Sequence, residues 1–329
     1  MIDKSARPGE FQIIERFFRP LATDPGAFAL TDDAALYRPR AGEELVLTSD
    51  MVVEGVHFLA TETDASSIAK KALRVNLSDL AAKGAEPFGY LLSLALPAEW
   101  RAPWVKKFAD GLAEDQERYG VTLLGGDLSR ASGGATISIT ALGRVPRGRM
   151  VMRSGARPGD LVFVTGTIGD SALGLAWRDT RGLRAKAVKL LWGRYLRPEP
   201  RVELAAVLRR YATSAIDVSD GLVGDLGHIC DVSGVAAEIE AEAIPLSDAA
   251  RTFLRSDPSA FALILNGGDD YEILATVQAK SADRFHRAAE AAGVAVTRIG
   301  RVLKGEGPPV VRDAKGRPID VPAASYTHF

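Results

Sequence analysis

The chain has one cysteine, Cys230, among 329 residues, and this scarcity excludes an internal disulfide and any metal site built from several cysteines. It has four histidines, at positions 57, 228, 286 and 328, and none lies in a His-Glu-x-x-His motif, which argues against a zinc hydrolase. No Gly-x-Ser-x-Gly motif is present to carry a catalytic serine, and the helical pattern around Cys230 predicts a core position for it.

Long hydrophobic runs are also absent. Apolar segments such as residues 88–97 are too short to span a bilayer, and the first ten residues lack the apolar centre of a signal peptide. The 41 basic and 42 acidic residues nearly cancel, so charge gives no reason to expect a nucleic acid or an anionic membrane as a partner. With only one cysteine, the chain suits a reducing compartment, and we expect it in the cytoplasm.

The length and the pattern of elements predict two α/β domains. Strands are expected at 45–48, 88–96, 121–124 and 135–145, and they alternate with helices at 10–18, 66–83 and 103–118. A basic, Gly/Pro-containing linker follows at 146–149 and divides the chain into domains 1–149 and 150–329. In the second domain, strands at 160–164, 236–239, 271–277 and 294–299 are interleaved with helices from 172, and at 185–195, 200–211, 222–231 and 282–292.

Aspartates recur where apolar segments end, at the positions Asp32, Asp33, Asp50, Asp127, Asp217, Asp220, Asp269 and Asp270. Gathered carboxylates repel one another unless a cation neutralises them, and Mg²⁺ prefers carboxylates, waters and phosphates as ligands. Each aspartate alone is equally well explained as a helix cap or a turn residue. The whole set is better explained as a magnesium site that receives phosphates.

Asn76 and Asp79 are three residues apart on one face of an otherwise apolar helix. That face is either exposed to solvent, with Lys83 as an ion-pair partner of Asp79, or part of a site. Spacing alone leaves both open.

Two glycine-containing stretches suit phosphate. Gly125-Gly126-Asp127 lets the backbone approach a ligand closely, and Gly166-Thr-Ile-Gly-Asp-Ser171 opens a helix whose free N–H groups suit an anion. Neither is a Walker A loop, and an ordinary capped turn is the alternative for both. Arg153 and Arg197 are further candidates for phosphate contact, or else ordinary surface charges.

Seven motifs in register resemble those of the thiamine-monophosphate kinase family, and the resemblance runs from Gly9 to Phe329. They are Thr48-Ser-Asp-Met-Val-Val-Glu-Gly-Val-His-Phe58, Lys71-Ala-Leu-Arg-Val-Asn-Leu-Ser-Asp-Leu-Ala-Ala82, Leu124-Gly-Gly-Asp127, Thr165-Gly-Thr-Ile-Gly-Asp-Ser171, Arg197-Pro-Glu-Pro-Arg201, Asp217-Val-Ser-Asp-Gly-Leu222 and Gly267-Gly-Asp-Asp-Tyr-Glu272.

The resemblance implies a two-domain fold of the aminoimidazole ribonucleotide synthetase type, with the N-terminal sheets of a homodimer closing a shared barrel. It implies transfer of the terminal phosphoryl group of ATP to thiamine monophosphate, with several Mg²⁺ ions. The family's metal ligands correspond to Asp33, Thr48, Ser49, Asp50, Asp79, Asp127, Asp217 and Asp220. Its ATP contacts correspond to Gly126, Asp127, Arg153 and Ser219, and its substrate contacts to His57 and Asp269. For His57, a structural role is the alternative.

Four positions depart from the family pattern. Thr31 replaces a glycine before Asp32-Asp33, which matters only if that turn needs a positive φ. Asp269 replaces a glutamate and shortens the expected substrate contact by one methylene. Tyr195 replaces a histidine, and Pro322-Ala-Ala-Ser325 lacks the aromatic residue that the family commonly places over its substrate.

The implied chemistry needs no general base, because the attacking phosphate oxygen is already ionised at neutral pH. Two alternatives remain. One is another ATP-dependent enzyme on the same scaffold, such as aminoimidazole ribonucleotide synthetase or selenophosphate synthetase, although the latter expects a reactive cysteine near the N-terminus and this chain has none before Cys230. The other is a nucleotide- or metal-binding protein without catalytic activity.

Overall fold

The computed structural model describes residues 8–61, 63–179 and 185–321, which divide into two compact units. Unit 1 contains the chain up to Leu80 and Glu86–Gly148, and unit 2 contains Ala81–Ala85 and the chain from Arg149 onward. The segment Pro322–Ser325, where the family aromatic is missing, lies outside the described residues. Within the described part of the chain, no helix is both long enough and apolar enough to cross a membrane.

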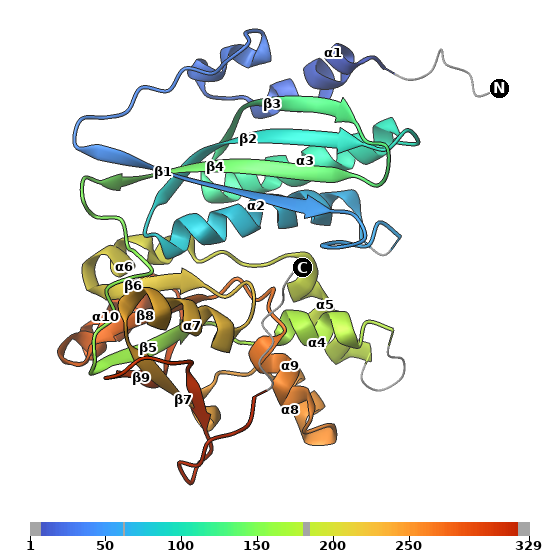
Figure 1. Ribbon diagram of the computed structural model, residues 1–329. Helices are drawn as coiled ribbons and strands as arrows, with labels where there is room; N and C mark the ends of the chain where they lie inside the picture. The colour runs from blue at the N-terminus through green and yellow to red at the C-terminus, as the bar shows by residue number, and fades with distance from the viewer. Residues whose placement is uncertain (1–7, 62, 180–184, 322–329) are drawn as a thin grey trace. The chain divides into compact units, whose positions relative to one another are not determined.

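Unit 1 is built on a four-stranded sheet with the order β1-β4-β2-β3. Its strands are β1 (Glu43–Val53), β2 (Glu86–Leu96), β3 (Thr122–Arg130) and β4 (Thr136–Pro146). β4 runs antiparallel to both β1 and β2, whereas β2 and β3 are parallel. β1 and β3 are therefore the two edge strands (Figure 1).

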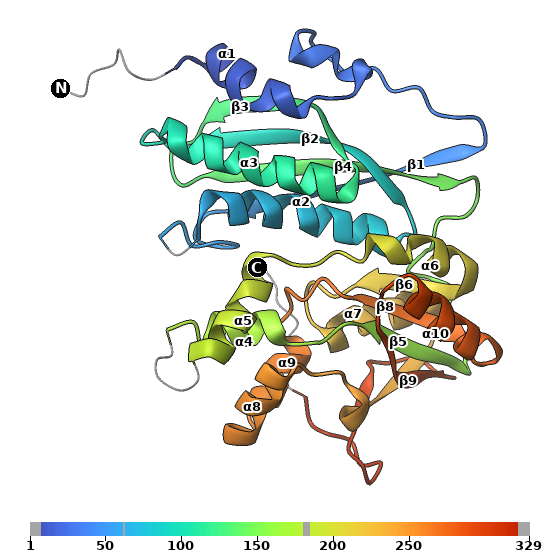
Figure 2. The same ribbon diagram turned by 180° about the vertical axis from the view of Figure 1, so that it is seen from behind.

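Two long helices, α2 (Ala65–Ala82) and α3 (Ala102–Tyr119), cover one face of this sheet (Figure 2). α3 ends where Gly120 adopts a left-handed conformation, which glycine reaches without a steric penalty. Along β4 the residues alternate strictly, and Ile137 and Ile139 are fully buried. Period-two burial therefore fixes which side chains of each strand face the helices.

The N-terminal segment runs through short helical turns before it reaches β1. The helix expected at 10–18 is present as α1 (Glu10–Ile13) continued by a π-helical turn (Ile14–Phe18). Two 3-10 turns follow at Arg19–Leu21 and Pro25–Leu30.

Unit 2 contains a six-stranded sheet with the order β10-β7-β9-β5-β8-β6. Its strands are β5 (Asp160–Thr165), β6 (Ala212–Asp217), β7 (Ala236–Glu240), β8 (Ile273–Gln278), β9 (Val296–Leu303) and β10 (Val310–Arg312). Its helices are α4 (Asp170–Ala176), α5 (Ala185–Leu196), α6 (Ala205–Tyr211), α7 (Leu222–Ser233), α8 (Asp248–Ser256), α9 (Ala260–Asn266) and α10 (Ala282–Ala291).

Both faces of this second sheet are covered. Val162 and Val164 of β5 belong to one apolar cluster, which also contains Cys230 of α7, while Phe163 between them belongs to a second cluster with Phe285 of α10. Successive side chains of a strand point to opposite faces, so β5 is buried on both sides. Cys230 is a core residue, as its helical pattern predicts.

The structure corrects two sequence-based boundaries that concern the aspartates. β1 continues to Val53 and β3 to Arg130, so Asp50 and Asp127 lie inside strands and not after their ends. An edge strand tolerates such polar residues because one side of it is open. The segment before Asp269, for which no element was expected, is helix α9. β6, α8 and β10 were not expected.

The buried ion pair between α2 and α3 yields a prediction about stability. The guanidinium of Arg74 donates to both carboxylate oxygens of Asp115, each at 2.8 Å, and the two side chains are 5% and 1% exposed. Asp115→Ala removes the carboxylate that faces the buried charge of Arg74. We therefore expect the free energy of unfolding, measured with urea, to fall by about 3–5 kcal/mol. Asp110→Ala, which breaks the exposed pair with Lys106, is the control and should cost at most about 1 kcal/mol. Equal losses in the two variants would contradict this account.

Candidate active site

The first group of expected site residues lies between β1 and α2. The hydroxyl of Thr48 donates to a carboxylate oxygen of Asp79 at 2.5 Å, and the N–H of Asp50 donates to the side-chain oxygen of Asn76 at 3.0 Å. Because side chains alternate along a strand, Thr48 and Asp50 share the partly buried face of β1. The structure therefore brings Thr48, Asp50 and Asp79 to one contact between strand and helix.

Ser49 points to the opposite face of β1. Its exposed hydroxyl lies 3.0 Å from the hydroxyl of Thr140 on β4. The backbone of β1 thus separates the hydroxyl of Ser49 from the side chains of Thr48 and Asp50. Ser49 can join them through its main-chain carbonyl oxygen.

The polar face of α2 is turned toward β1 and not toward solvent. Asn76 is 0% exposed, and its side-chain nitrogen donates to the carbonyl oxygen of Ala72 at 3.0 Å. The side-chain amide of Asn76 can bond to Asp50 and Ala72 in this orientation only. If the amide were flipped, its NH₂ group would face the N–H of Asp50, and two donors would be opposed. Lys83, considered as a partner for Asp79, donates to the carbonyl oxygen of Ala215. The face that spacing left undecided is therefore packed against β1 and is not an ordinary solvent-exposed face.

A second group lies at the other edge of the same sheet. It surrounds a cavity of about 290 Å³ in unit 1 that is lined by Asp32, Asp33, Gly126 and Asp127. Apolar side chains, among them Phe11, Leu30 and Leu92, form another part of the lining. The lining of the cavity therefore offers both carboxylates and apolar side chains to a ligand.

The chain reaches Asp33 through a left-handed turn. Phe28, Ala29 and Leu30 have φ values of 48°, 53° and 57°, a conformation that costs roughly 1–2 kcal/mol for each non-glycine residue. Thr31 itself has a φ of −106°, and its hydroxyl donates to the carbonyl oxygen of Phe28 at 2.7 Å. The position therefore does not need the glycine of the family pattern.

His57 closes the turn that follows β1. Its ring nitrogen Nδ1 accepts a hydrogen bond from the backbone N–H of Val53 at 3.0 Å. The backbone N–H of His57 donates to the carbonyl oxygen of Val53 at 2.9 Å. This supports the structural role for Nδ1. Any contact with a substrate falls to Nε2.

In unit 2, the expected ligands sit on the loop between β6 and α7. Asp217 is the buried last residue of β6, and Ser219 and Asp220 follow it. One carboxylate oxygen of Asp225 accepts the N–H groups of Ser219, Asp220 and Gly221 at 3.0, 3.1 and 3.2 Å. Asp225 thereby holds three successive residues of the ligand-bearing loop.

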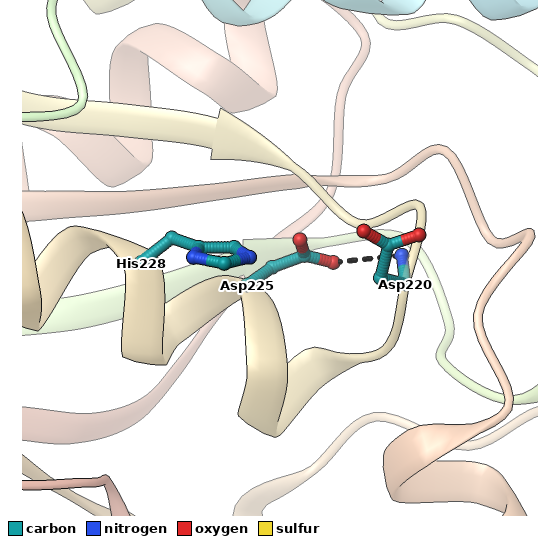
Figure 3. Close-up of side chains that lie close together, drawn as sticks. All are labelled: Asp220, Asp225 and His228. Atoms are coloured by element: carbon teal, nitrogen blue, oxygen red, sulfur yellow. Dashed lines mark hydrogen bonds between the residues drawn. The ribbon is translucent and has the colours of Figure 1, made fainter. Parts of the chain in front are cut away.

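Figure 3 shows Asp225 between Asp220 and His228, whose ligand atoms all lie within 4.8 Å of one another. Burial raises the pKa of Asp225 to about 7, and the charge of Asp220 adds to the rise. Asp225 was not among the residues expected at the site. An acidic residue on the buried face of a helix, three residues after Leu222, was the available signal.

The loop that carries Asp269 is joined to this ligand loop by backbone hydrogen bonds. The N–H of Asp269 donates to the carbonyl oxygen of Ser219, and the N–H of Tyr271 donates to that of Val218, both at 2.8 Å. Asp269 and Tyr271 adopt left-handed φ values of 63° and 51°. Such conformations persist where surrounding contacts hold them, and they concentrate at functional sites.

The glycine-rich turn Gly166–Ser171 does not match the expectation of a free anion site. The N–H of Gly169 donates to both carboxylate oxygens of Asp270, at 3.0 and 2.9 Å. A carboxylate of the chain itself thus takes the place that a phosphate oxygen was expected to fill. Burial raises the pKa of Asp270 well above its ordinary value, and the charges of Asp170 and Glu272 raise it further.

Buried Glu272 ties the same turn to a different arginine from the two expected. It accepts hydrogen bonds from the hydroxyl of Thr165 and from the guanidinium of Arg201. Arg153 and Arg197 are both exposed. They remain candidates for phosphate contact, whereas Arg201 has a structural partner.

Comparisons with known proteins agree with this arrangement. Residues 31–145 match the family model "AIR synthase related protein, N-terminal domain", and residues 157–312 match "AIR synthase related protein, C-terminal domain". The chain is 44% identical to thiamine-monophosphate kinase of Caulobacter vibrioides, over 98% of this chain and 92% of that protein.

Two solved structures are similar over most of the chain. Thiamine-monophosphate kinase from Stenotrophomonas maltophilia is 42% identical with a TM-score of 0.79, over 88% of this chain and 91% of that one. AaThiL complexed with AMPPCP and TMP is 34% identical with a TM-score of 0.77, over 91% of both chains.

The raised pKa of Asp270 predicts a pH-dependent cost. A carboxyl group whose folded-state pKa exceeds its unfolded value destabilises the fold increasingly as pH rises from about 4 toward the folded pKa. Asp270→Asn keeps an acceptor for Gly169 and cannot ionise, so its stability relative to the wild type should improve with rising pH. Urea unfolding at a series of pH values from about 5 to 8 measures this difference. A difference that is constant over the series would contradict the assignment.

Proposed function

This chain belongs to the thiamine-monophosphate kinase family of AIR synthase related proteins, and from that premise we propose that it transfers the terminal phosphoryl group of ATP to thiamine monophosphate. The products are thiamine diphosphate and ADP. The observation that carries the proposal is the 44% identity to a thiamine-monophosphate kinase over 98% of the chain. The related protein AaThiL has been solved in complex with AMPPCP and TMP.

The residues of the candidate site suit hard divalent cations. Thr48, Asp50 and Asp79 offer only oxygen donors, as do Asp33 and Asp127, and Mg²⁺ prefers such donors together with phosphate oxygens. Bound Mg²⁺ neutralises phosphate charge and aligns the two reacting groups. Ser49, through its carbonyl oxygen, and Asp217 and Asp220 of unit 2 complete the ligand set that we propose.

The chain's own residues bind and orient the two substrates. We assign ATP contacts to Gly126, Asp127, Arg153 and Ser219, and contacts with thiamine monophosphate to His57 and Asp269. The left-handed Asp269, held by the carbonyl oxygen of Ser219, keeps the substrate contact beside the ATP contact. No residue acts as a general base, because the acceptor phosphate is ionised at neutral pH. The rate enhancement comes from positioning of the two substrates and from electrostatic stabilisation of the transition state.

We further propose a cytoplasmic homodimer whose unit 1 sheets face each other. The face of the sheet opposite α2 and α3 exposes the apolar side chains of Leu45, Leu47, Met51 and Leu91, from 37% to 61%. Exposed apolar side chains gathered on one sheet face mark an interaction surface. Two such sheets closing on one another form the barrel implied by the family resemblance. Within this scheme, unit 1 dimerises and unit 2 completes the ATP and substrate site.

The function is tested by product analysis. Purified protein with ATP, Mg²⁺ and thiamine monophosphate should form thiamine diphosphate, detected by chromatography, and Asp50→Asn and Asp220→Asn should each lower turnover at least about a hundredfold. ATP binding without ADP formation from any acceptor would favour a non-catalytic protein. Near-normal turnover of both variants at saturating Mg²⁺ would remove the metal assignment.

The dimer is tested by charge placed on the exposed sheet face. Leu47→Lys combined with Leu91→Lys should shift the protein from dimer to monomer in sedimentation experiments, because a buried unpaired charge disfavours association. Val232→Lys, at a similarly exposed apolar position of α7 in unit 2, is the control and should leave the dimer intact. A wild-type protein that sediments as a monomer would contradict the proposal.

A further inference from the structure

We infer that Asp225 is a positioning residue for the phosphoryl transfer, and that it acts through the backbone of the loop that carries Ser219 and Asp220. The inference rests on the proposed function, which assigns Ser219 to ATP and Asp220 to a cation. In this role Asp225 binds neither of them. It keeps the loop in the conformation that receives them.

Three successive N–H groups converge on one oxygen of Asp225. The backbone N–H groups of Ser219, Asp220 and Gly221 donate to its Oδ2 at 3.0, 3.1 and 3.2 Å, and Figure 3 shows the bond from Asp220. Successive N–H groups point to one place in a tight turn, where they form a small concave site for an anion. Asp225 fills that site and therefore specifies the conformation of the loop as well as its location.

Gly221 makes this turn possible. Its φ of 121° and ψ of 146° lie in a region that side chains of other residues rarely permit. A Cβ atom added there would lie 2.7 Å from the Cα atom of Asn266. The third N–H can thus reach Asp225 because position 221 is a glycine.

The carbonyl oxygens of the same loop are held by another segment. The N–H of Asp269 donates to the carbonyl oxygen of Ser219, and the N–H of Tyr271 donates to that of Val218, both at 2.8 Å. The backbone of the loop is thus bonded to Asp225 on one side and to the segment with the proposed substrate contact on the other. A loop held on both sides has few accessible conformations.

The anchor consists of backbone hydrogen bonds, so it leaves the carboxylate of Asp220 to a cation. Asp225 is 1% exposed, whereas Asp220 is only half-buried. The three N–H groups offset the cost of burying the Asp225 carboxylate. A loop that is ordered before the cation arrives loses less conformational entropy when the cation binds.

The inference predicts a change in the Mg²⁺ requirement. Asp225→Ala removes the acceptor, so the cation must order the loop as it binds. We expect the free Mg²⁺ concentration at half-maximal rate to rise at least about tenfold, while kcat at saturating Mg²⁺ stays within about threefold of the wild type. Asp220→Asn removes the proposed ligand itself and should not recover with excess Mg²⁺.

Two further substitutions separate the acceptor from its charge. Asp225→Asn keeps an oxygen at the acceptor position and loses the charge, whereas Asp225→Glu keeps the charge and moves the oxygens by one methylene. Asp225→Asn should need at most about threefold more Mg²⁺ than the wild type, and Asp225→Glu should resemble Asp225→Ala. This pair also carries the test if Asp225→Ala does not fold.

Amide hydrogen exchange reports on the loop without metal or substrate. Mass spectrometry of a peptide that covers residues 217–224 should show protected amides in the wild type and in Asp225→Asn. In Asp225→Ala and Asp225→Glu, exchange at these amides should be at least about tenfold faster.

Asp160 is the matched control in the same unit. It is 4% exposed, and its carboxylate accepts the N–H of Arg157 at 3.0 Å, so it too is a buried aspartate that holds a backbone group. β5 and β6 both run antiparallel to β8, which places the first residue of β5 and the last residue of β6 at opposite ends of the sheet. Asp160→Ala should therefore lower stability and leave both the Mg²⁺ requirement and the exchange at residues 217–224 unchanged.

Three outcomes would contradict the inference. Unchanged Mg²⁺ dependence in both Asp225→Ala and Asp225→Glu, with an active wild type, would overturn it and leave the proposed function intact. Equal impairment of Asp225→Asn and Asp225→Ala would also overturn it, because the charge and not the acceptor would then matter. A wild type without kinase activity would remove the proposed function and this inference together, even if the exchange results were as expected.

Discussion

The main constraint on this molecule is that the carboxylates proposed to bind metal must be held in place with most of their oxygens left available. A hydrogen bond to a ligand oxygen competes with a cation for that oxygen. Apart from the bond between Thr48 and Asp79, the observed anchors therefore act on the backbone of the ligand-bearing segments. Buried Asn76 accepts the N–H of Asp50, and buried Asp225 accepts three N–H groups around Asp220. Both anchors come from the helix that follows the ligand segment along the chain. Burying such polar groups is tolerable because each has its hydrogen-bond partners.

The same constraint explains the strained backbone in unit 2. Asp269 and Tyr271 take left-handed conformations, and their N–H groups are bonded to the loop that carries Ser219 and Asp220. Asp270, between them, turns inward to Gly169. Three consecutive residues thus have three tasks: the proposed substrate contact, closure of the glycine-rich turn and attachment to the loop that carries Ser219 and Asp220. The cost in conformational energy is offset by these bonds.

Much of the fold was predictable because its apolar periodicity is regular. The helix expected at 66–83 is α2 (Ala65–Ala82), and the strand expected at 88–96 is β2 (Glu86–Leu96). The predictions were wrong where polar residues continue a strand, as at Asp50 in β1, because an edge strand need not alternate strictly. No element was predicted before Asp269, where a short apolar run forms α9, because such a run has no clear period. For the candidate site, the sequence predicts the aspartates. Asp225, Glu272 and the placement of Asp50 and Asp127 at two different sheet edges depend on tertiary contacts that no local pattern encodes.

The central claim, that scattered aspartates gather divalent cations around two phosphates, can be examined most directly by crystallography. Crystals grown with Mn²⁺, thiamine monophosphate and a non-hydrolysable ATP analogue would give anomalous peaks at the cation positions. The account predicts peaks within coordination distance of Asp50, Asp79 and Asp127, with phosphate oxygens completing the ligand shells. Peaks absent from all three carboxylates, or carboxylates directed into solvent beside a bound nucleotide, would contradict it.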